Sequence, residues 1–325
     1  MKPPLLILTG PTGSGKTALS ISLAKAIDGE IISADSMQVY QQMDIGSAKI
    51  MPTEQQGIPH HLIDILAPDE EFHVVMFQQL AKEATSQIYQ RGRVPIVVGG
   101  TGFYIQALLY DINFTEARSD FTARCEWESI AEIKGSPTLH QMLQEVDPEA
   151  AKQIHPNNVK RVIRALEFHA QTGEKISHHN ATERHKESPF NYVYFVLNDK
   201  RERLYQRIDT RVDEMIDKGL VGEVANLKAQ GYGKELVSMQ GLGYKEILSY
   251  LEGDCTIEEA IYLLKRDTRH FAKRQLTWFR RERDVIWLNK QDFDYSEEAL
   301  IQKILEITKN RGIVDFLRDS VGVLT

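Results

Sequence analysis

The chain has 325 residues and a net charge of −7, and its 42% hydrophobic and 26% charged residues predict a globular protein of one large or two ordinary domains. Its two cysteines, Cys125 and Cys255, lie far apart, which favours a reducing compartment and argues against a disulfide framework or a cysteine-based zinc site. The start is too short for a signal peptide and no apolar run reaches membrane-spanning length, so we expect a cytoplasmic protein without a membrane partner.

The first predicted elements enclose a glycine-rich loop. An apolar strand over 5–9 leads into GPTGSGKT, which fits G-x-x-x-x-G-K-[ST], and a helical pattern follows. This context predicts backbone N–H groups that converge on a phosphate, with Lys16 on its terminal oxygens and the Thr17 hydroxyl on Mg²⁺. The alternative, a glycine-rich turn with a chance Lys-Thr, fits the flanking segments less well. The candidate phosphate-binding residues are Gly10, Pro11, Thr12, Gly13, Ser14, Gly15, Lys16 and Thr17.

Two further predicted strands, 30–34 and 94–98, end in residues that can carry chemistry. Asp35 directly follows the first, on the edge where open α/β sheets place their ligands. It is a candidate base or metal-associated acid, although the residues alone favour a cap on the next turn. After the second strand, glycines allow close approach to a ligand and Thr101 offers a hydroxyl, which is compatible with a tight turn into a helix. A helix is predicted over 74–90 between the two strands.

Several histidines invite a metal interpretation. His60, His61 and Asp64 lie close in sequence, but adjacent histidines in a strand point to opposite faces, so we expect hydrogen-bonded structural roles. Residues 112–188 lack strand patterns and predict an all-helical insertion. Within it, the polar stretch containing His178, His179 and His185 is interpreted as a solvated loop.

The last third of the chain returns to alternating elements. A strand over 192–197 precedes a helix with Arg203, Arg207 and Arg211 on one stripe, which is either a phosphate clamp or a solvated face paired with Glu202, Asp209 and Asp213. The segment 265–283 combines eight basic residues with aromatics, which suits nucleic acid, or else an amphipathic helix whose aromatics face the core. A final strand over 285–288 precedes a helical tail.

Four segments together carry a family resemblance: GPTGSGKT at 10–17, ADSMQVY at 34–40, VVGGTGFY at 97–104 and KRQLTWFR at 273–280. In this order, with DIGSAK, PHHLID, HPNNVKRVIRALE and MQGLGYKE, the chain resembles the bacterial tRNA dimethylallyltransferases over about residues 5 to 290. Ser47 stands where threonine is expected, and Ile50-Met51-Pro52 replaces a more basic link.

The resemblance implies an α/β fold of the P-loop kinase type, a parallel sheet flanked by helices. Its core would comprise residues 1–111 and 189–325, and the helical insertion 112–188 would contact tRNA. The phosphate loop would hold the diphosphate of dimethylallyl diphosphate rather than a nucleotide, and no ATP would be consumed. A dimethylallyl group would pass to N6 of adenosine 37 in the tRNA anticodon loop, in a monomeric enzyme that uses Mg²⁺ held by Thr17.

The same resemblance assigns individual roles. Asp35 would be the base, and Lys16, Thr101 and Arg211 would stabilise the departing pyrophosphate, with Arg207 a weaker choice for the clamp. The implied tRNA contacts are Asp35, Ser36, Met37, Gln38, Thr101, Arg124, Lys160, Arg161, Val162, Ile163, Arg164, Gly243, Tyr244, Lys245, Lys273, Arg274, Gln275 and Arg280.

Three other functions remain open from the sequence. A transferase acting on free AMP or ADP would share the front motifs, but it would need neither the helical insertion nor the KRQLTWFR segment. An ATP-dependent small-molecule kinase is the generic meaning of the phosphate loop. A non-catalytic RNA-binding protein is disfavoured, because the phosphate loop is intact and is accompanied by Asp35 and Thr101.

Overall fold

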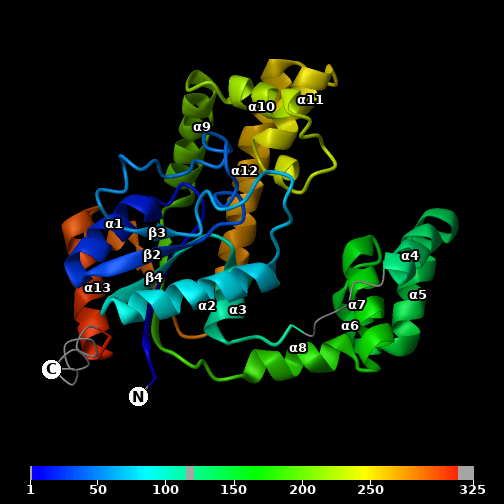
Figure 1. Cartoon of the computed structure of the whole chain (residues 1–325), viewed down its shortest axis with the longest axis horizontal. Helices are drawn as coiled ribbons and strands as arrows, with labels where there is room; N and C mark the ends of the chain where they lie inside the picture. Colours follow the sequence, from blue (N-terminus) through cyan, green and yellow to red (C-terminus); the bar gives the residue numbers. More distant parts are fainter. Residues whose placement is uncertain (1, 115–120, 314–325) are drawn as a thin grey trace. The chain divides into compact units, whose positions relative to one another are not determined.

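The protein is described here by a computed structural model that covers residues 2–114 and 121–313 (Figure 1). It divides into two compact units: Met1–Leu109 with Pro189–Thr325, and Tyr110–Ser188. Of the predicted helical tail, α13 (Glu297–Asn310) is present, and residues 314–325 lie outside the described part. Across the described ranges, no helix is long and apolar enough to cross a membrane.

The larger unit is built on a six-stranded sheet in the order β3-β2-β4-β1-β5-β6. Every strand pairs in parallel with its neighbours, which confirms the predicted α/β fold. The strands are rich in β-branched and aromatic residues, and the central ones are buried on both faces, as a parallel sheet covered by helices requires. Their bounds are β1 Pro4–Thr9, β2 Gly29–Ala34, β3 His60–His61, β4 Val94–Gly99, β5 Asn191–Asn198 and β6 Val285–Asn289.

Helices cover both faces of this sheet. On one face, α1 (Lys16–Ile27) packs beside α13, and Leu23 and Ile304 join alternate strand residues such as Leu6 and Phe195 in one core (Figure 1). On the other face, α2 (Val74–Gln90) and α3 (Gly102–Leu109) pack on β2 and β4. Because the strands run parallel, the loops after β1, β2, β4 and β6 all leave from the same edge, where the candidate site lies.

The chain after β5 forms a helical layer of its own: α9 (Arg201–Asp217), α10 (Leu220–Ala229), η1 (Ser238–Gln240), α11 (Tyr244–Glu252) and α12 (Ile257–Phe279), followed after β6 by η2 (Lys290–Phe293). Thr256 and Glu259 form a capping box that begins α12. This helix contacts α9 and α3, and Phe279 is fully buried, so the basic segment is largely an amphipathic helix.

The smaller unit contains α4 (Phe121–Lys134), α5 (Ser136–Val146), α6 (Pro148–Gln153), α7 (Val159–Thr172) and α8 (Ile176–His185). Leu139, Leu143 and Leu166 lie in its core. One prediction is wrong here, because His178, His179 and His185 belong to helix α8 rather than to a loop. Packing decides this: the His179 ring lies 5.0 Å from Phe168 of α7, a contact that a polar local sequence does not reveal.

The two histidines of β3 take the structural role predicted for them. The Nδ1 atom of His60 lies 2.8 Å from the Ile58 carbonyl, and His61 Nε2 lies 2.7 Å from the buried Glu30 carboxylate. Arg91 and Arg93 also donate hydrogen bonds to Glu30. Burial would raise the pKa of Glu30, but the hydrogen bonds from Arg91 and His61 outweigh it and lower the pKa to about 2.

Candidate active site at the carboxyl edge of the sheet

The phosphate loop, residues 10–17, joins β1 to α1 and depends on its glycines. Gly13 and Gly15 adopt φ of 80° and 91°, a left-handed region that favours glycine. A Cβ on Gly10 would lie 2.4 Å from the Leu197 carbonyl oxygen of β5, so no side chain fits there. The Ser14 N–H donates to the Pro11 carbonyl at 3.1 Å, which closes the turn. The loop is therefore a glycine-dependent turn between a strand and a helix, as its sequence predicts.

Three of the proposed catalytic groups come together beside this loop. Burial lowers the pKa of Lys16 to about 8, the Asp35 carboxylate opposes this shift, and the charge of Arg211 adds to it. Burial likewise lowers the pKa of Arg211 on α9, again against the effect of Asp35. Lys16 at the start of α1, Asp35 after β2 and Arg211 in the middle of α9 are thus close enough for their charges to influence one another.

Asp35 takes one of the two roles that the sequence left open, the cap on the next turn, and its role as a base stays a prediction. Its Oδ1 accepts hydrogen bonds from the backbone N–H groups of Met37 at 2.9 Å and Gln38 at 3.4 Å, so it does cap the following turn. The same cap holds the carboxylate at the edge of the sheet next to Lys16. Burial raises the pKa of Tyr104 to about 12, and the charge of Asp35 contributes to this increase.

The glycine-rich turn after β4 accommodates α12. A Cβ on Gly100 would lie 2.1 Å from Gln275, and one on Gly102 would lie 2.2 Å from the Trp278 ring. Gln275 accepts a hydrogen bond from the Thr12 N–H at 2.9 Å and donates one to the Gly100 carbonyl at 2.9 Å. Its side chain therefore ties the phosphate loop to the turn that carries Thr101, whose own N–H donates to the Ala34 carbonyl at 3.2 Å.

Burial corrects part of the predicted tRNA surface. Val162 and Ile163 lie in the core of the helical unit, while Tyr244 and Gln275 are buried in the sheet unit. Protein encloses these four side chains, so in this structure they pack against their neighbours, and a direct contact with tRNA stays a prediction. The other predicted contacts that carry a positive charge are exposed or half-buried: Arg124, Lys160, Arg161 and Arg164 in the helical unit, and Lys245, Lys273, Arg274 and Arg280 in the sheet unit.

The remaining predicted tRNA contacts are uncharged residues in two turns. Ser36, Met37 and Gln38 are half-buried in the turn after Asp35, and Gly243 is buried at the start of α11. Met37 packs closely on the loop before α11, since a Cβ on Gly241 would lie 2.4 Å from its terminal methyl.

Two acids of α9 pair with another helix rather than with the arginine stripe of α9. Asp209 and Asp213 instead pair with Arg269 and Lys265 of α12. Arg207 approaches the phosphate loop, because a Cβ on Gly15 would lie 3.0 Å from its guanidinium.

Sequence reasoning missed Lys290, which lies just after β6. Its ammonium donates to the Ser14 carbonyl at 3.4 Å, and burial together with the charge of Arg207 lowers its pKa. Its position immediately after a strand, at the carboxyl edge, is the signal that could have identified it.

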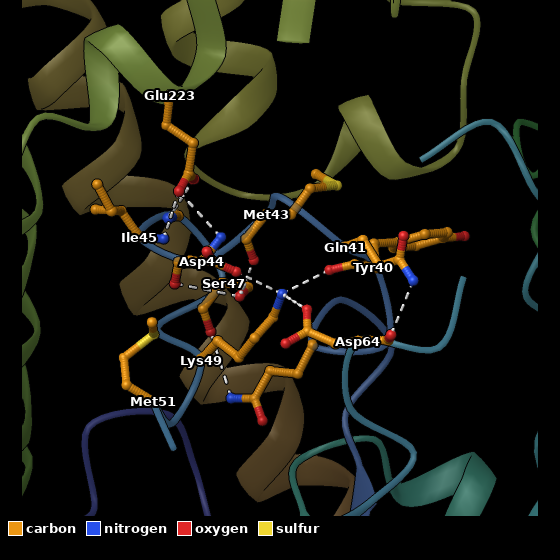
Figure 2. A network of polar contacts seen from close by, with 12 residues as sticks. Tyr40, Gln41, Met43, Asp44, Ile45, Ser47, Lys49, Met51, Asp64 and Glu223 are labelled. Carbon is orange, nitrogen blue, oxygen red and sulfur yellow. Dashed lines mark hydrogen bonds and ion pairs between the residues drawn. The ribbon is translucent and has the colours of Figure 1, made fainter. Parts of the chain in front are cut away.

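The buried side chain of Lys49 holds the loop that follows β2 through several hydrogen bonds (Figure 2). The ammonium of this buried residue donates to the Tyr40 carbonyl and the Asp44 carboxylate, each at 2.6 Å, and to Asp64. The DIGSAK and PHHLID segments of the sequence therefore meet in one polar cluster.

Thr17 of the phosphate loop is the residue predicted to hold a divalent cation. Thr17 lies exposed at the start of α1, and within the described ranges no three His, Cys, Asp or Glu side chains gather as a metal site would require. Mg²⁺ usually retains several waters and takes one or two protein ligands plus substrate phosphates, so a single hydroxyl fits it. This fold and site define an enzyme that binds a phosphorylated substrate at a cationic edge beside a carboxylate.

Comparison with known proteins makes this class specific. The sequence profile described as IPP transferase matches residues 38–282, and one described as isopentenyl transferase matches residues 3–66. The chain is 61% identical over 311 residues to the tRNA dimethylallyltransferase of Lachnoclostridium phytofermentans, covering 96% of this chain and 99% of that relative. The chain belongs to the tRNA dimethylallyltransferase family and is a prenyltransferase, which confirms the resemblance read from its motifs.

Solved structures agree with this assignment. The full-length tRNA isopentenylpyrophosphate transferase of Bacillus halodurans is 43% identical with a TM-score of 0.72, covering 97% of this chain and 100% of that chain. A eukaryotic dimethylallyltransferase whose structures follow its action on tRNA is 31% identical with a TM-score of 0.81, covering 95% of this chain and 79% of that chain.

Proposed function

We propose that the edge of the sheet around Lys16, Asp35 and Arg211 transfers a dimethylallyl group from dimethylallyl diphosphate to N6 of adenosine 37 in the tRNA anticodon loop and releases pyrophosphate. The observation that carries this proposal is that one carboxylate, Asp35, interacts electrostatically with two half-buried cations, Lys16 and Arg211, at one edge of the sheet. The cations suit a diphosphate leaving group, and the carboxylate suits a proton acceptor beside it. The relatives named for this activity support it.

The chemistry needs no nucleotide hydrolysis. The N6 amine attacks the allylic carbon, the N–C bond forms as the C–O bond breaks, and pyrophosphate leaves with the bonding electrons. Asp35 accepts the proton that N6 loses, which helps because the amine lone pair is delocalised into the ring. Lys16, Arg211 and the backbone N–H groups of the phosphate loop stabilise the pyrophosphate. Thr101 lies at the same edge of the sheet and supplies a hydroxyl to the pyrophosphate.

Mg²⁺ is proposed as the cofactor, with Thr17 as its protein ligand. When bound, it would neutralise charge on the diphosphate oxygens, which is the chemistry expected of such an ion beside a phosphate loop. The exposed side chain of Thr17 at the start of α1 supports this placement.

The exposed basic residues of both units are proposed to hold the tRNA, and the enzyme to act in the cytoplasm as a monomer. Lys160, Arg161 and Arg164 lie near the start of α7, and Lys273, Arg274 and Arg280 lie in or directly after α12. Such side chains suit phosphates, while the target base must leave its stack, which costs about a few kcal/mol.

The test is mass spectrometry of tRNA nucleosides after incubation with the protein, Mg²⁺ and dimethylallyl diphosphate, without ATP. We expect isopentenyladenosine at position 37, formed about 10²- to 10⁴-fold more slowly by Asp35→Asn, the range for loss of a general base. The matched control is Asp69→Asn, which changes an exposed carboxylate and should leave the rate unchanged. Prenylation of AMP but not tRNA, or a requirement for ATP, would overturn the proposal.

A further inference from the structure

The loop over residues 44–48 is held by a carboxylate that lies far away in the sequence. Glu223 of α10 accepts hydrogen bonds from three successive backbone N–H groups: Asp44 at 3.0 Å, Ile45 at 2.7 Å and Gly46 at 3.1 Å (Figure 2). Successive amides of this kind form a concave anion site, which here is filled by the protein's own side chain. Charge-assisted bonds to N–H groups are among the strong hydrogen bonds of proteins.

Tyr244 of α11 completes this attachment. Its hydroxyl donates to Glu223 Oε1 at 2.8 Å and accepts from the Ser47 N–H at 3.2 Å. Burial and the neighbouring Glu223 charge raise the pKa of Tyr244, so the hydroxyl keeps the proton that it donates. Its ring lies against Gly46, where a Cβ would stand 2.6 Å from a ring carbon, so the loop can approach only as glycine.

The same loop also holds Gln38, the last residue of the turn that Asp35 caps. Gln38 donates from Nε2 to the Ala48 carbonyl at 3.3 Å, and its own N–H belongs to the Asp35 cap. The backbone carbonyl of Gln38 also accepts a hydrogen bond from the Asp64 N–H at 3.2 Å. A displacement of loop 44–48 would therefore move Gln38 and loosen the turn that begins at Asp35.

We propose that Glu223 and Tyr244 are positioning residues for tRNA: they fix loop 44–48 and, through Gln38, hold the acceptor side of the site. This inference rests on the proposed role of the segment after Asp35 in binding the tRNA. The hydrogen-bonded path from Glu223 to Gln38 contains no residue of the phosphate loop, so binding of pyrophosphate should change much less than binding of tRNA when the path is broken. Tyr244 also lies next to Lys245. The hydrogen-bonded path from Glu223 to Gln38 therefore links the GYKE turn to the segment that follows Asp35.

The experiment compares Glu223→Gln and Tyr244→Phe with the parent protein. Both variants keep side-chain volume, and Tyr244→Phe removes one hydroxyl from a buried ring, so it folds even if the first does not. The measurements are the KM for tRNA, the single-turnover rate of prenylation, the Kd for inorganic pyrophosphate and the melting temperature. The matched control is Glu235→Gln, which makes the same chemical change at an exposed position between α10 and η1.

We expect each variant to lower kcat/KM for tRNA by about 10- to 100-fold. A small displacement from productive geometry produces an effect of this size. The Kd for pyrophosphate should stay within about twofold, and the double variant should lose less than the product of the single losses because the two side chains share one network. Equal losses for tRNA and pyrophosphate, or folded variants with unchanged kcat/KM for tRNA, would overturn the inference. Asp35→Asn, measured in parallel, separates this failure from failure of the proposed chemistry.

Discussion

Replacing Gln275 by methionine would test whether α12 supports the phosphate loop or reads tRNA directly. Methionine keeps the length and nearly the volume of the side chain but offers no hydrogen bond. The Thr12 N–H and the buried Gly100 carbonyl would both lose their partner. An unsatisfied buried polar group costs about 1–3 kcal/mol, and the half-buried Thr12 N–H can be partly rehydrated, so we expect a total loss of about 2–4 kcal/mol in the free energy of unfolding.

The assay is urea unfolding followed by circular dichroism, together with calorimetric titration of inorganic pyrophosphate. Because Thr12 lies in the phosphate loop, the Kd for pyrophosphate should rise by about tenfold, the equivalent of 1.4 kcal/mol. The control is Lys273→Met, an exposed change two residues away on the same helix. It should leave unfolding within about 0.5 kcal/mol of the parent and raise the KM for tRNA instead.

The opposite pattern would refute this reasoning. If Gln275→Met unfolds like the parent, binds pyrophosphate equally well and raises only the KM for tRNA, then the two hydrogen bonds seen in the free protein do not determine its role. The direct contact with tRNA that the sequence predicted for Gln275 would then stand.

Three further predictions follow from the charged groups. The Kd for pyrophosphate should become about tenfold weaker between pH 7 and pH 9 as Lys16 deprotonates near its lowered pKa of about 8, and Lys16→Met should lack this loss in a parallel titration. Glu30, whose folded pKa of about 2 lies below its ordinary 4.5, stabilises the fold in full above pH 4.5 and loses this contribution as pH falls toward 2. This contribution to the free energy of unfolding is about 3 kcal/mol. Glu30→Gln should therefore make stability depend less on pH between 4.5 and 2, as measured by acid unfolding followed by fluorescence. Lys49→Met should lower the free energy of unfolding in urea by about 2 kcal/mol. This is less than the loss expected when a fully buried ion pair is broken, because Asp44 and Asp64 are half exposed. An unchanged urea midpoint would contradict this prediction.

Local patterns in the sequence predicted the strands and the phosphate loop well. Strands β1 and β4 carry apolar runs bounded by glycine or proline, and the loop is defined by residues adjacent in the chain. The helix over 74–90 followed from its apolar spacing and has those bounds in the structure. The polar sequence of helix α8, interpreted as a loop, gives no periodic signal; in the structure this helix packs on α6 and α7, with His179 against Phe168.

The sequence by itself determined the family, the parallel α/β fold and the positions of the candidate groups at strand ends, because each depends on residues within a short window and on their order. The tertiary structure alone decided which of those groups meet. Thr12 and Gln275 are 263 residues apart, and Asp44 and Glu223 are 179 apart, so no local pattern links either pair. It also decided which predicted contacts face solvent: Val162 and Arg161 are neighbours in one helix, yet the first is buried and the second exposed, since one helical step turns a side chain from the core to the surface.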